Sequence, residues 1–133
     1  MSDVREILFR GFCINYQEWV YGFYYIEKGR GVDGSKDSEI HVIKNKTGTQ
    51  IVDPCTVGQF TGLMDKHGKK IFEGDKVRFL RKQGYQTIPK GAIYEIKYFE
   101  YGQYCGFGVD ENKPLTYKRS QEIEVIDETK EEL

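Results

Sequence analysis

The sequence has little of what favours helices: a single alanine, Ala92, and five leucines in 133 residues. Against these stand 12 isoleucines, nine valines and 18 phenylalanines or tyrosines. Such β-branched and aromatic side chains fit the pleated surface of a sheet. No stretch shows a sustained 3.6-residue apolar repeat, so we expect any helix to be short, at 52–57 or in the tail. The composition therefore predicts an all-β fold of single-domain size.

Cysteine is scarce, and its spacing argues against the usual frameworks. Cys13, Cys55 and Cys105 are odd in number and none belongs to a C-x-x-C pair, so we expect neither a disulfide framework nor a zinc site. We expect reduced thiols that pack as small apolar residues. No window approaches the roughly 20 apolar residues of a membrane span, and no basic-then-apolar leader opens the chain. We therefore expect a cytoplasmic protein with no membrane partner.

Residues suited to catalysis are also few. His41 and His67 are the only imidazoles, and neither lies at an informative spacing from a nucleophile. Asp65, Glu73 and Asp75 could suggest paired catalytic carboxylates or a metal site. Turn chemistry explains them better, because acids followed by glycine are typical of tight turns. We predict no catalytic residue and no metal ligand.

A G-x-G-x-x-G pattern occupies residues 29–34. In dinucleotide-binding proteins this pattern leads into a helix whose N-terminus holds the pyrophosphate. Here the following residues lead into a β-like run instead, so we interpret the segment as a hairpin loop. We expect no cofactor.

Charge is uneven along the chain although the net charge is only −1. Residues 66–97 contain nine lysines or arginines against three acids, an excess of six. Within this stretch, cations and aromatics mix over 76–90, a pattern typical of a surface that binds single-stranded nucleic acid. Cations on a solvated strand edge, where they discourage edge-to-edge pairing, give the same pattern. The candidate nucleic-acid residues are Arg78, Arg81, Lys82 and Lys90. At the other end of the chain, residues 127–133 form an acidic tail.

Short runs with period-two alternation, separated by Gly, Asn, Asp or Pro, predict a series of strands. We expect strands near 5–13, 18–26, 40–44, 57–63, 76–80, 92–99, 104–109 and 122–126, and a loop at 29–38. The close spacing predicts antiparallel sheets. We expect one domain over 1–133, in which a β-meander at about 1–50 accompanies a small SH3-like barrel at about 57–126.

The second predicted strand is unusually aromatic. Four residues at alternate positions should share one face: Trp19, Tyr21, Phe23 and Tyr25. So large an apolar face needs cover from the core, a loop or another subunit. These four residues are therefore the candidate protein-contact surface.

Two linked motifs in the middle of the chain carry a family resemblance. Residues 54–63 read P-C-T-V-G-Q-F-T-G-L, and residues 65–75 read D-K-H-G-K-K-I-F-E-G-D. With R-E-I-L-F-R at 5–10 and E-V-I at 124–126, these blocks resemble the YopX family of phage and prophage proteins. One departure is Asp127, where a glycine is common in the family.

This resemblance implies a β-rich fold, a meander beside an SH3-like barrel, an origin in mobile phage DNA, and self-association. The family has no assigned biochemical activity. We also expect Gly62, Gly68 and Gly74 to lie where a side chain would obstruct a turn or bulge.

Our hypothesis is a non-catalytic accessory protein of a phage or prophage in the cytoplasm of a bacterial host. It would act through protein–protein contacts with an unknown partner or through self-association as a homo-oligomer. The alternative is a small β-barrel that binds single-stranded nucleic acid through 76–90.

Overall fold

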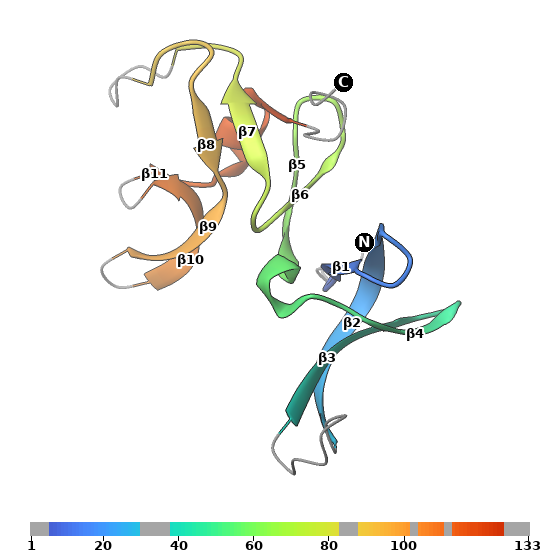
Figure 1. The fold of residues 1–133 in the computed structure, drawn as a ribbon. Coiled ribbons are helices and arrows are strands. Elements are labelled where there is room, and N and C mark those ends of the chain that lie inside the picture. Colours follow the sequence, from blue (N-terminus) through green and yellow to red (C-terminus); the bar gives the residue numbers. More distant parts are fainter. Residues whose placement is uncertain (1–5, 30–37, 83–87, 102–103, 111–112, 127–133) are drawn as a thin grey trace, which may run out of the picture. The chain divides into compact units, whose positions relative to one another are not determined.

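The computed structural model describes residues 6–29, 38–82, 88–101, 104–110 and 113–126. The chain divides into two compact units, residues 1–59 and 60–133. Antiparallel strands build both units, so the predicted all-β antiparallel fold is confirmed (Figure 1). The first unit contains β1 (Phe9–Cys13), β2 (Glu18–Gly29), β3 (Ser38–Asn45), β4 (Gly48–Ile51) and a 3-10 turn, η1 (Pro54–Thr56).

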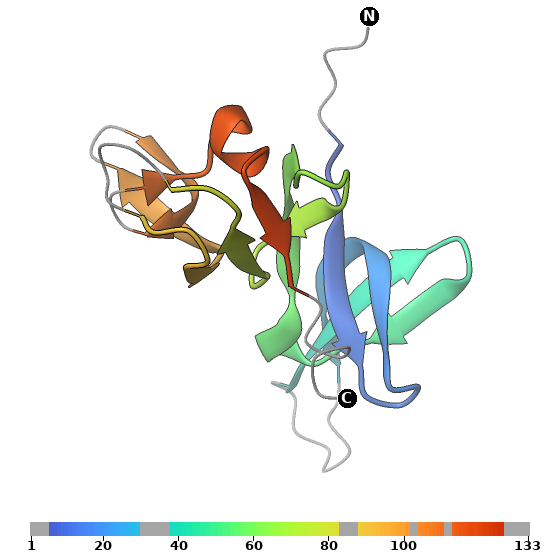
Figure 2. The ribbon, with the colours of Figure 1, turned by 90° about the horizontal axis from the view of Figure 1, so that it is seen from above.

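In the first unit the strands follow the order β4-β3-β2-β1. The N-terminal half of β2 pairs with β1 and its C-terminal half pairs with β3. Figure 2 shows β1 and β2 side by side. After β4 the chain returns to β1, because the backbone amide of Asp53 donates to the carbonyl of Phe12. The strands enclose a small core made of Cys13, Val20, Ile43 and Val52.

Strand β5 (Gly58–Met64) begins in the first unit and ends in the second. Its first two residues pair with β1. From Phe60 onward it pairs with β6 (Lys70–Phe72), with a register shift before Met64. Gly62 lies within this shift at φ +90°, a value that glycine adopts without strain.

Among its described residues, the second unit adds six further strands and one short helix. They are β7 (Lys76–Phe79), β8 (Ile93–Glu95), β9 (Lys97–Tyr101), β10 (Tyr104–Asp110), β11 (Lys113–Pro114), α1 (Tyr117–Ser120) and β12 (Ile123–Val125). Two three-stranded sheets result, with the orders β12-β7-β8 and β11-β10-β9. Thr116 caps α1, because its side-chain oxygen accepts a hydrogen bond from the amide of Arg119.

The core of the second unit contains side chains from most of its strands. The fully buried members include Ile71, Val77, Phe79, Ile96 and Ile123. The strands that the structure describes here form separate sheets and do not close into a barrel. The SH3-like detail of the expected fold therefore stays a prediction.

The turn that joins β5 to β6 is organised by one buried carboxylate. Oδ1 of Asp65 accepts hydrogen bonds from the amides of His67 and Lys69, and Oδ2 accepts one from the amide of Val125. Gly68 completes the turn at φ +80°, and Gly74 has φ +95° in the next turn. The expected turn roles of Asp65 and these glycines are confirmed.

Several elements differ from those that the sequence predicts. The sequence pattern missed β4, β6, β11 and α1, and it predicted one strand at 92–99 where the structure has β8 and β9. Buried Ile96 separates these two strands, and its amide donates to the carbonyl of Asp75. The predicted loop at 29–38 falls mostly on 30–37, outside the described residues, as does the tail at 127–133.

Candidate protein-contact face

Four aromatic residues of β2, at alternate positions, lie on one side of the first unit's sheet. Trp19, Tyr21, Phe23 and Tyr25 are 41%, 44%, 71% and 38% exposed, which is high for side chains of this size. Val20 and Tyr24, at the alternate positions, belong to the core on the other side. The predicted common face is thus present. We call it the aromatic face of β2.

At its N-terminal end the face continues onto β1. Phe12 pairs with Trp19 in the register, and their rings meet edge to face with centroids 5.6 Å apart. The guanidinium of Arg10 lies over the Trp19 ring, 4.6 Å from its centroid. These contacts fix the orientation of the indole ring while leaving much of it exposed.

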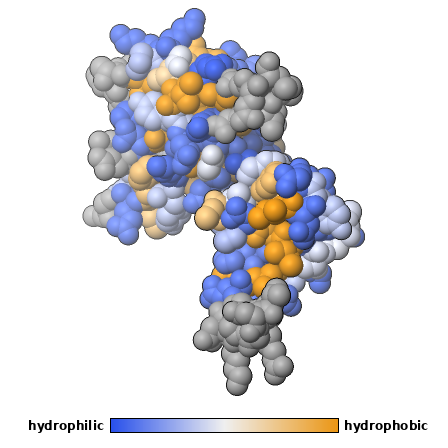
Figure 3. Space-filling model, in the orientation of Figure 1, coloured by the Kyte–Doolittle hydropathy of each residue, from blue (hydrophilic) through white to orange (hydrophobic). Residues whose placement is uncertain are grey.

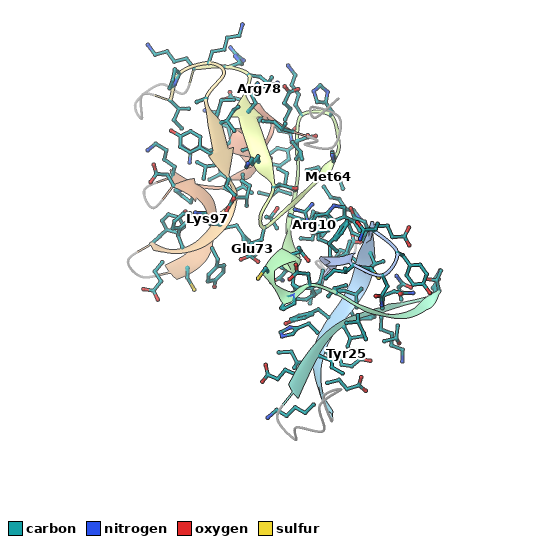
Figure 4. All side chains as sticks on the ribbon, in the orientation of Figure 1. Arg10, Tyr25, Met64, Glu73, Arg78 and Lys97 are labelled. Carbon is teal, nitrogen blue, oxygen red and sulfur yellow. The ribbon has the colours of Figure 1, made fainter. Side chains whose placement is uncertain are left out.

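At its C-terminal end the face continues onto β3 and β4. Val42 stands opposite both Tyr25 and Ile51, and it is fully buried although it lies on the outer side of the sheet. Ile51 itself is exposed. Figure 3 shows hydrophobic residues gathered in a stripe over this sheet. Figure 4 labels two residues of the first unit that lie on this side of the sheet, Arg10 and Tyr25.

The four candidate nucleic-acid cations have unequal surroundings. Arg78, on β7, is half-buried, and its Nη1 lies 3.1 Å from Oε1 of Glu124 on β12. His67 Nε2 lies 3.3 Å from the other oxygen of the same carboxylate. Arg78 thus pairs within its own sheet.

The remaining three cations are all exposed. Arg81 and Lys82 follow β7, and Lys90 lies in the turn before β8. The segment between them, 83–87, is outside the described residues. The backbone amide of Gly91, next to Lys90, donates to the carbonyl of Phe79 at the end of β7. That these cations bind nucleic acid stays a prediction.

The acids considered for catalysis act as turn residues. Asp65 binds three backbone amides, as described above. Oδ2 of buried Asp75 accepts a hydrogen bond from the amide of Phe72. In the described part of the chain, no three His, Cys, Asp or Glu side chains gather where they could hold a metal ion. That the protein is not an enzyme stays a prediction.

The cysteines differ from one another in burial. Cys13 is buried in the first core, as expected, but Cys55 and Cys105 are exposed, so the expectation of apolar packing is wrong for these two. Cys55 is the middle residue of η1, which has no buried residue, and Cys105 lies on a strand of a small sheet. The hydroxyl of Tyr98 donates to Sγ of Cys105 at 2.8 Å, and this bond raises the pKa of Tyr98.

The second unit also has an open pocket of about 350 Å³ beside β8 and β9. Its lining includes Tyr94, Phe99 and Val109, together with Glu95 and Lys97, whose charged atoms lie 3.8 Å apart. The volume is at the small end of the range for ligand sites. No local sequence pattern indicates this pocket, because its lining residues come from three separate strands.

No helix in the described part of the chain is long and apolar enough to cross a membrane.

Comparisons with known proteins identify the family. No curated protein matches the chain. Among solved structures, protein EF1440 from Enterococcus faecalis is similar, with a TM-score of 0.45 and 20% identity over 92% of each chain. The family model described as YopX protein matches residues 8–128, nearly the whole sequence. The chain therefore belongs to the YopX family.

Proposed function

We propose that this YopX-family protein is a non-catalytic accessory protein of a phage or prophage, acting in the cytoplasm of a bacterial host. It acts by contacting protein through the aromatic face of β2. The observation that carries this proposal is the row of four exposed aromatic side chains on one strand face. Contiguous exposed apolar surface of this kind marks interaction sites in soluble proteins.

The make-up of the face supports a protein partner. Aromatic residues and arginine are enriched in the centres of protein interfaces, where they lose their water on binding. Trp19 and Arg10 provide such a pair, already held in contact. Because Phe12 also packs against the indole ring, little side-chain freedom remains to be lost when a partner binds.

Nucleic acid is less well supported as a partner. A surface that binds single-stranded nucleic acid needs cations along a groove, beside aromatic side chains on which the bases can stack. Arg78, one of the four candidate cations, pairs with Glu124 on the neighbouring strand of its own sheet.

Site-specific photo-crosslinking tests the proposed contact. Benzoylphenylalanine in place of Phe23 should crosslink to protein in living bacterial cells that express the full chain. The same group in place of Tyr117 is a matched control, because Phe23 and Tyr117 are both 71% exposed. Crosslinks of defined mass from position 23 and not from position 117 support the proposal. If benzoylphenylalanine at position 23 gives no protein crosslink, the proposed function is contradicted.

A further inference from the structure

Two opposite charges stand symmetrically about Tyr25 on the aromatic face. Lys44 pairs with Phe23, two residues before Tyr25, whereas Glu27 follows Tyr25 by two residues. Both side chains are exposed, and neither forms an ion pair with another described residue. Since alternate residues of a strand share a face, both charges border the aromatic row.

This spacing is self-complementary under a two-fold rotation. Consider a two-fold axis that is perpendicular to the strands and passes at the level of Tyr25. It places a second copy face to face with the first, with its β2 running in the opposite direction. Each Glu27 then comes level with Lys44 of the second copy. The other face-to-face arrangement, with the two β2 strands parallel, would instead put like charges at the same level. The charges therefore favour the antiparallel arrangement, which is a closed, isologous dimer.

The exposed area on the face is enough for such a dimer. With roughly 200 Å² for each aromatic side chain, the four exposed fractions together amount to about 400 Å². Exposed Ile51 adds to this. A standard interface covers roughly 800 Å² on each partner, of which somewhat more than half is apolar. The aromatic face thus supplies most of the apolar area that one partner of a stable dimer needs.

We propose that the partner of the aromatic face is a second copy of this chain, packed face to face about a two-fold axis at Tyr25, with Glu27 of each copy paired to Lys44 of the other. This inference rests on the proposed function and names the partner of the same surface. The apolar row provides the affinity, and the two charge pairs at its border set the direction of the strands.

Charge reversal in the full-length protein tests the pairing. We compare the wild type with Glu27→Lys, Lys44→Glu and the double variant by sedimentation equilibrium over micromolar to millimolar concentrations. Each single variant creates two like-charge contacts per dimer and should weaken dimerisation about tenfold or more. The double variant restores opposite charges and should return to within about threefold of the wild type.

Glu39→Lys serves as the control. Glu39 is exposed on β3, but it pairs with Lys28 on the opposite side of the sheet, so its reversal should leave the dimer unchanged. Circular dichroism checks that every variant is folded.

The outcomes separate this inference from the proposed function. If the wild type stays monomeric, a second copy is not the partner. The same conclusion follows if the wild type dimerises but neither single charge reversal weakens the dimer. A double variant that recovers no affinity overturns the Glu27–Lys44 pairing. If the wild type is monomeric while position 23 crosslinks to a different protein, the proposed function stands and this inference fails. If position 23 crosslinks to nothing and the wild type is monomeric, both fail.

Discussion

Asp65 and Val125 are joined across 60 residues of sequence, because Oδ2 of Asp65 accepts a hydrogen bond from the Val125 amide at 2.9 Å. Asp65 lies in the turn after β5, whereas Val125 ends β12. The same carboxylate holds the two amides of its own turn. The side chain is therefore both a turn former and the link between that turn and the last strand.

Replacing Asp65 should cost much of the protein's stability. Asp65→Ala leaves three backbone amides without their acceptor in a buried site, so we expect a loss of about 3 kcal/mol or more in the free energy of unfolding. Urea denaturation measures it. Asp53→Ala is the control, because Asp53 caps η1 with one bond, to the Cys55 amide, and should cost about 1 kcal/mol. Equal losses for the two variants would contradict the linking role of Asp65.

A second prediction concerns close packing of the first unit. A Cβ at Gly22 would collide with the backbone carbonyl of Lys44. Gly22→Ala should therefore force the strands apart and cost about 1–3 kcal/mol.

Gly106→Ala is the matched control, because a Cβ at Gly106 meets nothing within 4 Å. It should change stability by less than about 0.5 kcal/mol. Thermal unfolding of the two variants gives the comparison. A Gly22→Ala protein as stable as Gly106→Ala would show that β2 and β3 are not closely packed at Gly22.

A third prediction concerns nucleic acid. Because Arg78 is paired with Glu124, which offsets its charge, we expect no salt-sensitive binding of single-stranded DNA. Fluorescence anisotropy with a labelled oligonucleotide, from 50 mM salt upward, provides the measurement. Binding that weakens with salt, and that Arg81→Gln, Lys82→Gln and Lys90→Gln together remove, would instead favour the nucleic-acid hypothesis.

The sequence predicted the strands whose alternation is regular and whose ends carry turn residues. It missed β4 and β11, because runs of four and two residues are too short to show a period. It missed α1 for the same reason, since a four-residue helix with only Ser120 buried has no apolar stripe. The division at Ile96 depends on a hydrogen bond to Asp75, a distant residue that no local pattern reveals.

The candidate site was predictable in part. Alternation along β2 placed its four aromatic residues on one face, and the structure has them there. The neighbours of the face were not predictable, because they depend on strand register. Which residue of β3 lies beside Phe23 or Tyr25 is set by pairing, and only this pairing reveals the symmetry of Glu27 and Lys44.

The most direct test of the central claim, that chains meet at the aromatic face of β2, is the solution mass of the full-length protein by light scattering. The wild type and the Tyr117→Ser control should have the mass of a dimer at high concentration. Phe23→Ser should have the mass of a monomer with unchanged thermal stability, because Phe23 is largely exposed and contributes little to the core. A Phe23→Ser protein that retains the dimer mass would contradict the account.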